Sequence, residues 1–317
     1  MTDPRKHFLS LFDINNSHII NFPGFIFFCG GIVLKDNSLP PTSVRDIVLR
    51  KLFCDAPDLC TKIIQAEDIQ EWLHFGVYKD LMLFEQHLAS LANIIVLFVE
   101  SPGSIAELGA FSFNEHIEDK LLIFIKEHDY IEKSFISLGP IKYLKDKYDS
   151  VKVYPWKTET ALTSEEIQIR IVLDSMEGIT EDIISDIKFV YNSKPKSVKF
   201  CNTSVGHMML FLCDIMELFL AVKLKEIQEY FEQMEIPITI DDLKKLLFIL
   251  KTLELIKEFN YGNDLYYTRN IETPMIKYHF KDSDFSFSRV RIKSTVLEFY
   301  EACDLRRLRG LRKFRNE

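Results

Sequence analysis

The chain has 317 residues, a formal net charge of −8 and a hydrophobic content of 47%. This length predicts two domains, since a domain usually has roughly 100–200 residues, and the hydrophobic content is sufficient for packed cores. The negative net charge excludes a protein that coats nucleic acid through overall charge alone.

The first half of the chain alternates apolar strands with helices. Residues 22–34, FPGFIFFCGGIVL, predict a buried strand that ends in a turn at Gly30 and Gly31. A helix over 79–91 leads into the run IIVLFV at 94–99, which is typical of a central parallel strand. Further strands are predicted at 61–66, 121–125 and 151–154. This alternation predicts an α/β domain with a doubly wound parallel sheet over residues 1–158.

The pattern of apolar and polar residues changes after Trp156. Residues 159–200 are predicted to form a helical connector, because the stretches 161–176 and 181–192 look amphipathic. The TSEE sequence at 163–166 matches a helix capping box.

Residues 201–317 fit a winged-helix domain with a basic tail. Three helices are predicted at 204–220, at 223–234 and from 240 onward. Two strands follow, LIKEFNY and LYYTR, joined by the turn Gly262-Asn263-Asp264. Three helices followed by a hairpin is the order of a winged helix-turn-helix.

Targeting and ligand-binding signals are scarce. The stretch MTDPRKHFLSLFD lacks a signal-peptide core, and the apolar stretch 208–222 contains two acids and is shorter than the about 20 residues of a membrane helix. The six cysteines form no CxxC pair and no zinc-type Cys/His cluster. We therefore expect a cytoplasmic protein with no membrane contact, no metal and no resident cofactor.

The stretch 92–111, ANIIVLFVESPGSIAELGAF, is the most informative for chemistry. A buried strand delivers the chain to a Ser-Pro-Gly turn, and a helix is predicted to begin at Ser104 with Glu107 in its first turn. Ligands of open α/β sheets bind beyond the strand ends, and a carboxylate there can attack an anomeric carbon or stabilise an oxocarbenium-like transition state. The alternative is that Ser104 and Glu107 form a capping box.

The motifs IFFCGG and ESPGSxxELGAFS resemble those of the nucleoside deoxyribosyltransferase superfamily. Residues 100–112 and 133–140 are especially similar to the effector proteins of retrons, which are antiphage systems built from a reverse transcriptase and its multicopy single-stranded DNA. The resemblance covers the N-terminal half well and the C-terminal half only by the order of its elements.

The resemblance implies a role for several residues. Glu107 matches the nucleophilic glutamate of the superfamily, and Glu85 matches the acid that contacts the nucleobase. A core position for Phe27, a solvated charge on an amphipathic helix for Glu85, and a plain helix cap for Ser104 remain open alternatives. The residues implied in substrate binding are Glu85, Phe27, Gly30, Gly31, Ser101 and Ser104.

Two departures from the superfamily bear on the substrate. Asn93 stands where the enzymes often carry an aspartate, and a second acid near Ser101 is missing. Fewer acids suit a nucleotide, because its phosphates are repelled less. NAD is the substrate we expect, since its nicotinamide is already cationic and leaves without protonation.

The charge of the C-terminal domain argues against a simple operator-binding role. Residues 203–270 hold seven basic and eleven acidic residues, a balance of −4, which is the wrong sign for phosphate-driven binding. The domain is therefore expected to dock a protein, or to touch nucleic acid through the wing and the tail. The candidate contacts in the tail, which could equally be a solvated arm, are Arg306, Arg307, Arg309, Arg312, Lys313 and Arg315.

The sequence leaves three functions open. The first is a toxin effector that breaks an N-glycosidic bond when it is released from the reverse transcriptase and its multicopy DNA. The second is a nucleotide-sensing DNA-binding regulator, and the third is a non-catalytic scaffold of the complex. The resemblance also implies a homo-oligomer.

Overall fold

The computed structural model describes residues 2–69, 76–162, 167–269 and 271–316. It divides into two compact units. We call them the sheet unit (Pro23–Asp68 and Leu88–Lys194) and the helical unit (Met1–Phe22, Ile69–His87 and Pro195–Glu317). This division differs from the predicted boundaries after residues 158 and 200, since two earlier segments cluster with the C-terminal part of the chain.

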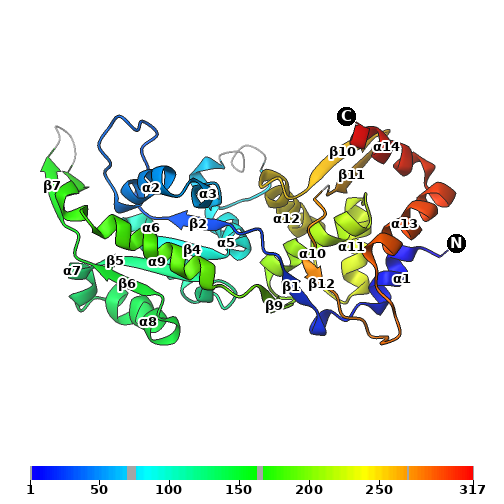
Figure 1. Ribbon diagram of the computed structural model, residues 1–317, viewed down its shortest axis with the longest axis horizontal. Helices are drawn as coiled ribbons and strands as arrows, with labels where there is room; N and C mark the ends of the chain where they lie inside the picture. Colours follow the sequence, from blue (N-terminus) through cyan, green and yellow to red (C-terminus); the bar gives the residue numbers. More distant parts are fainter. Residues whose placement is uncertain (1, 70–75, 163–166, 270, 317) are drawn as a thin grey trace. The chain divides into compact units, whose positions relative to one another are not determined.

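The sheet unit is built on five parallel strands in the order β3-β2-β4-β5-β6 (Figure 1). Every residue of β2 and β4 is buried, as expected for apolar strands covered on both faces. The strands are β2 (Ile26–Cys29), β3 (Ile63–Ile64), β4 (Ile94–Val99), β5 (Leu121–Lys126) and β6 (Val151–Tyr154). The predicted mixed α/β class with a parallel sheet is confirmed.

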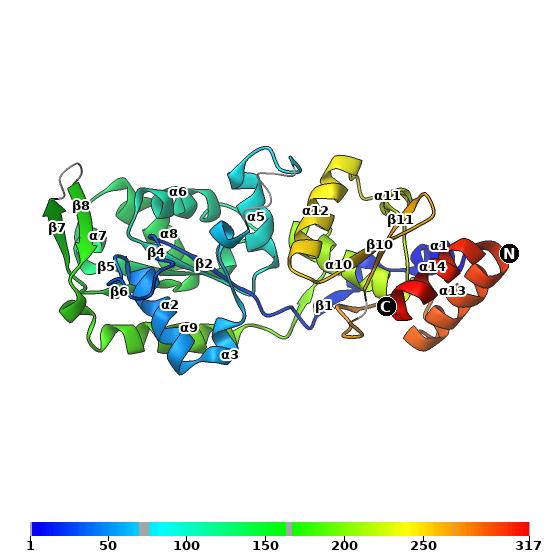
Figure 2. The same cartoon turned by 90° about the horizontal axis from the view of Figure 1, so that it is seen from above.

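Helices cover both faces of this sheet (Figure 2). On one face, α2 (Val44–Asp55) and α9 (Ile179–Ser193) pack on an apolar cluster that includes Phe28 and Trp156. On the other face lies α6 (Pro102–Phe111), where Phe111 meets Phe27 edge to face with ring centroids 6.2 Å apart. Shorter helices of this unit are α3 (Pro57–Cys60), α7 (Glu127–Ile131) and α8 (Lys142–Tyr148).

The predicted helix over 161–176 is wrong. The chain instead forms an antiparallel hairpin of β7 (Thr158–Leu162) and β8 (Ile167–Ile171), and the supposed capping box at 163–166 lies outside the described residues. The sequence IQIRI alternates with a period of two, which is a strand pattern. The second predicted helix of the connector is confirmed as α9.

The helical unit contains the predicted succession of three helices and a hairpin. Ser204 caps α10 (Val205–Leu218), and Thr239 caps α12 (Ile240–Thr252). Between them lies α11 (Leu224–Gln233). The hairpin pairs β10 (Lys257–Tyr261) with β11 (Asp264–Thr268), and Gly262 supplies the positive φ of 64° that its turn needs.

Several further elements complete the helical unit. A three-stranded sheet has the order β12-β1-β9, with β1 (His18–Ile20) between β9 (Ser197–Lys199) and β12 (Ile276–Lys277). Phe8 on α1 (Pro4–Leu11) packs edge to face on Phe219 and Tyr278. These contacts explain why the first 22 residues belong here. The last helices are α13 (Arg289–Cys303) and α14 (Leu305–Asn316).

One helix crosses the boundary between the units. In α5 (Leu81–Leu91) the residues up to His87 cluster with the helical unit, and Leu88 onward with the sheet unit. Among the helices that the structure describes, none is long and apolar enough to cross a membrane.

Candidate functional site

The strand order places a topological switch point between β2 and β4. The chain leaves β2 toward β3 on one side, and β4 continues toward β5 and β6 on the other. In doubly wound sheets, ligands bind beyond the carboxyl ends of the strands at such a point. Here the end of β2 carries Gly30 and Gly31, and the end of β4 carries Glu100 and Ser101. The structure thus brings together two pairs of residues that are separated by 70 positions in the chain.

Glu100 organises this edge of the sheet, and the sequence analysis missed it. Its Oε1 accepts hydrogen bonds from the backbone N–H groups of Gly31 and Arg45, each at 3.0 Å. Its Oε2 accepts from the N–H of Val44 at 2.6 Å. Val44 and Arg45 are the first residues of α2. The carboxylate therefore fills the helix N-terminus at which phosphates bind in many α/β folds.

Burial raises the pKa of the Glu100 carboxyl, although the three backbone hydrogen bonds and the nearby Arg45 guanidinium oppose the rise. The Arg45 side chain is buried and forms an ion pair with Glu67 at 2.6 Å. An acid directly after a central strand was the available signal, because that position always opens onto the carboxyl edge.

The two glycines are explained by this packing. A Cβ on Gly31 would lie 2.7 Å from the Cβ of Ser43 and 3.0 Å from Oε1 of Glu100. Gly30 has a φ of 151°, and a Cβ there would lie 2.9 Å from the Cβ of Phe98. Close packing therefore requires glycine at both positions, against Ser43 and the Glu100 carboxylate at Gly31 and against Phe98 at Gly30.

The predicted start of this helix, at Ser104, is wrong by two residues. α6 begins at Pro102, and Ser101 is its N-cap. The capping box joins Ser101 and Ser104: the Ser104 N–H donates to Oγ of Ser101 at 3.1 Å, and the Ser101 N–H donates to Oγ of Ser104 at 2.9 Å. Proline at the first helical position is the usual signal for this start.

This cap corrects two interpretations. Glu107 is not part of the capping box, so its alternative role as a cap is excluded. Ser104 is 1% exposed, and its hydroxyl accepts from the N–H groups of Glu100 and Ser101 and donates to the Ser101 carbonyl at 2.8 Å. Ser104 is therefore a structural residue of the turn at the third position of the helix, and the alternative that made it the N-cap is corrected, because Ser101 holds that position.

Glu107 lies in the second turn of α6. It falls three residues after Ser104 and four before Phe111, both of which are buried, so it shares the inward-facing side of the helix. The residue as a whole is half-buried, and its Oε2 is withdrawn from solvent. Acidic side chains are mostly exposed in proteins, so the partial burial of this carboxylate distinguishes Glu107 from a solvated surface charge.

The other predicted substrate contacts are placed as follows. Phe27 is 1% exposed and packs on Phe111, which makes it a core residue. Ser101 is half-buried, with its hydroxyl used in the cap. Glu85 is half-buried on α5, in the part that clusters with the helical unit.

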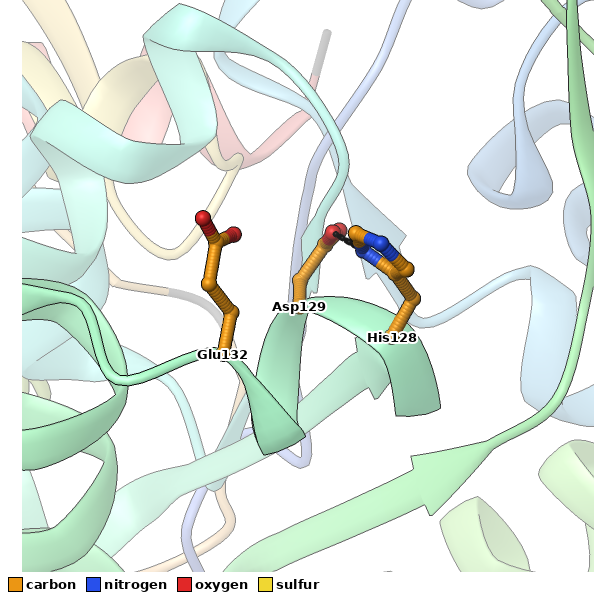
Figure 3. Close-up of side chains that lie close together, drawn as sticks. All are labelled: His128, Asp129 and Glu132. Carbon is orange, nitrogen blue, oxygen red and sulfur yellow. Dashed lines mark hydrogen bonds and ion pairs between the residues drawn. The ribbon is translucent and has the colours of Figure 1, made fainter.

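Among the residues that the structure describes, one group has the composition of a metal site. His128, Asp129 and Glu132 offer ligand atoms within 4.8 Å of one another (Figure 3). All three are exposed, and His128 Nδ1 lies 3.1 Å from an oxygen of Asp129. Exposed acidic groups of this kind are common on protein surfaces, so we assign no metal here.

The predicted contacts of the tail lie on α14. Arg307 is 3% exposed and forms ion pairs with Glu226 at 2.7 Å and with Asp304 at 3.0 Å. It is therefore part of the interior, and the prediction that it contacts nucleic acid is corrected. The other five residues are exposed on the helix: Arg306, Arg309, Arg312, Lys313 and Arg315.

The fold and this edge together define an α/β protein with a topological switch point in a parallel sheet and a half-buried glutamate on the following helix. Sequence comparison gives the family. The profile described as STM3845 retron effector protein matches residues 41–258. The chain therefore belongs to the STM3845 retron effector protein family.

Two similar proteins come from Escherichia coli. One, named "Retron Ec86 putative ribosyltransferase/DNA-binding protein", is 35% identical over 129 residues, which are 40% of this chain and 39% of that protein. Its Retron Ec73 counterpart of the same description is 41% identical over 128 residues, 38% of each chain. The aligned part thus spans about two fifths of the length of these relatives.

Proposed function

We propose that this chain cleaves the N-glycosidic bond of a nucleotide, with Glu107 as the reacting carboxylate. The observation that carries the proposal is the position of Glu107, half-buried on the inward face of α6 directly after the β4 edge and outside the helix cap. The word ribosyltransferase in the names of both relatives supports the same class of chemistry.

The ionised Glu107 acts on the anomeric carbon of the sugar. In one route it attacks that carbon as the base departs with the electrons of the glycosidic bond, and water then releases the sugar from the enzyme. In the other it stabilises the oxocarbenium-like transition state while water or another acceptor attacks. Its place in the second turn leaves it little help from the helix dipole, which acts mainly within the first turn.

NAD is the substrate we propose. Its nicotinamide carries a positive charge and leaves as a neutral base, so one carboxylate suffices and no general acid is required. Glu100, the acid closest to Glu107 in sequence on the strand side, is held by three backbone amides. It is therefore poorly placed to donate a proton to a leaving base.

The proposed biological role is that of a toxin effector in a retron antiphage system. Membership in the retron effector family supports a reverse transcriptase and its multicopy single-stranded DNA as partners that hold the chain inactive. Self-association, which the superfamily resemblance implies, belongs to the same proposal.

Metabolite profiling of cells that express the wild type or Glu107→Gln tests the proposal. Loss of NAD or another nucleotide, with a rise of its free base, is expected for the wild type alone. Glu115→Gln is the matched control, because its side chain is 82% exposed, and it should behave as the wild type. Unchanged nucleotide pools, or activity in Glu107→Gln, would reject the proposal.

A second candidate is a nucleotide-sensing regulator with a winged-helix DNA-binding domain. The order of α10, α11, α12 and the β10–β11 hairpin, and the term DNA-binding in the relatives' names, favour it. A non-catalytic scaffold of the complex is the remaining alternative. Both would keep their function in Glu107→Gln, so the same experiment separates them from an enzyme.

A further inference from the structure

The helical unit buries the helix that would enter a DNA groove. In a winged helix-turn-helix the third helix reads the major groove, and here that helix is α12. Its residues Leu246 to Leu250 are all at most 8% exposed. Five consecutive buried residues exceed one helical turn of 3.6 residues, so α12 is covered on every side along this stretch.

The cover comes from the segment before α5. The Tyr78 ring lies 6.1 Å from that of Phe248, and its hydroxyl lies 3.2 Å from the Lys245 carbonyl oxygen, to which it donates. Toward the start of α12, Lys244 and Lys245 are paired with Asp241 and Asp242. From Leu246 to Leu250 this helix thus offers phosphates no open face, and Lys251, its remaining lysine, is paired with Glu258 at 2.9 Å.

α14, unlike the covered stretch of α12, has an exposed side that carries basic residues. α14 packs one side against the hairpin, where Phe314 stacks on Phe259 with centroids 4.9 Å apart. Gly310 approaches so closely that a Cβ would lie 2.7 Å from the Cβ of Tyr261. Figure 1 shows α14 alongside β10. This contact fixes the helix, so its outward face is a rigid surface rather than a loose arm.

We propose that this outward face of α14 binds the phosphate backbone of nucleic acid without regard to sequence. It carries five exposed cations, and residues 305–316 contain no acid: Arg306, Arg309, Arg312, Lys313 and Arg315. Arg312 also forms an ion pair on the surface, with Glu301 at 2.9 Å. Arginine forks match phosphate oxygens in pairs, and this helix has six basic residues and no acid in a chain of net charge −8.

The surroundings of the helix favour nucleic acid over a membrane. Leu308 and Leu311 are each 2% exposed, and Leu305 at the start of α14 is 52% exposed. One exposed leucine is too little apolar surface to insert this helix into lipid. The inference rests on the proposed association with a nucleic-acid partner, and it names the surface that makes the contact. It needs no glycosidase activity.

The test compares charge-matched variants of the full chain. Arg306→Gln, Arg309→Gln and Arg315→Gln are combined in one variant, and Lys142→Gln, Lys196→Gln and Lys199→Gln in the control, all at exposed positions. Binding of a fluorescein-labelled DNA strand of about 30 nucleotides, single-stranded or duplex, is followed by anisotropy as the salt concentration rises.

The arginine variant should lose affinity by roughly tenfold or more at about 50 mM NaCl, and the slope of log K against log salt should fall by about 2 for single strands. The control, and Lys244→Gln on α12, should bind as the wild type. Replacing the same three arginines by lysine should largely restore binding.

Three results would overturn the inference. They are equal binding by the arginine variant and the wild type, an equal loss in the control, and wild-type binding to phosphatidylserine vesicles but to neither DNA. Circular dichroism establishes that each variant is folded. Since no nucleotide substrate is present, failure of the proposed glycosidase leaves this result unaffected.

Discussion

Glu100→Ala tests whether the carboxylate holds the site edge together. The substitution removes the acceptor for three backbone N–H groups, those of Gly31, Val44 and Arg45. An unsatisfied buried donor costs about 1–3 kcal/mol, and water can reach part of this half-buried site, so we take the lower end for each. The expected loss in the free energy of unfolding is about 3 kcal/mol.

Glu100→Gln separates charge from hydrogen bonding. Oε1 serves two donors and Oε2 serves one, whereas an amide has a single oxygen. Whichever way the amide is turned, at least one N–H group faces another donor. We expect these two facing donors to lower the free energy of unfolding by about 1 kcal/mol or more. This loss is smaller than the loss in Glu100→Ala.

Urea unfolding followed by Trp156 fluorescence measures these losses in the free energy of unfolding. Trp156 is 1% exposed in the sheet-unit core, and Trp72→Phe leaves it as the only tryptophan. A loss of about 3 kcal/mol moves the midpoint by about 1–2 M urea. Glu115→Ala is the control. If Glu100→Ala unfolds at the wild-type midpoint, the three hydrogen bonds do not stabilise the edge and our account of the glycines fails with them.

The raised pKa adds a pH dependence with a definite sign. Because the folded state holds the Glu100 proton more tightly than the unfolded chain, it binds more protons in the window just above the ordinary value of about 4.3. The stability of the wild type should therefore fall as the pH rises through that window. Glu100→Gln should lack this component, and a parallel pH profile in both proteins would contradict the assignment.

Three further predictions concern other sites. Gly31→Ala should destabilise the sheet unit by about 1–3 kcal/mol, because the new Cβ would lie 2.7 Å from the Cβ of Ser43. Arg307→Ala should cost about 1.5–3 kcal/mol in the helical unit, because it removes the 2.7 Å ion pair with Glu226, while Arg5 remains 3.0 Å from the same carboxylate. Burial lowers the pKa of His87 to about 4, so stability should fall as the pH drops from about 6.5 toward 4, and His87→Gln should flatten that profile.

Each of these has its own check. Arg309→Ala, at an exposed position of the same helix, should change stability by at most about 0.5 kcal/mol, and an equal loss in both arginine variants would contradict the buried network. Gly31→Ala with wild-type stability would show that the turn relaxes without cost. A His87→Gln profile as steep as that of the wild type would assign the acid sensitivity to other groups.

The buried strands were the best predicted part of the fold. The runs at 94–99 and 151–154 match β4 and β6 residue for residue, because β-branched and aromatic residues favour strands. The glycine turn and the three helices before the β10–β11 hairpin were also evident, since turn residues and helix caps are local signals.

Long-range packing was not available from the sequence. Nothing local shows that β1 pairs with β12, which lies more than 250 residues later. The role of Glu100 depends on the α2 N-terminus lying beside it in space. The helix start at Pro102 is a different case, because the Ser-Pro signal was present and the later serine was preferred to it.

The placement of β1 has a consequence for synthesis of the chain. All segments of the sheet unit lie between residues 23 and 194, whereas the helical unit needs both ends of the chain. During translation the sheet unit can fold first, as domains generally do when their sequence has emerged. β1 must wait until β9 and then β12 have left the ribosome. The part of the protein that holds Glu107 is thus completed while the basic helix α14 is still unmade.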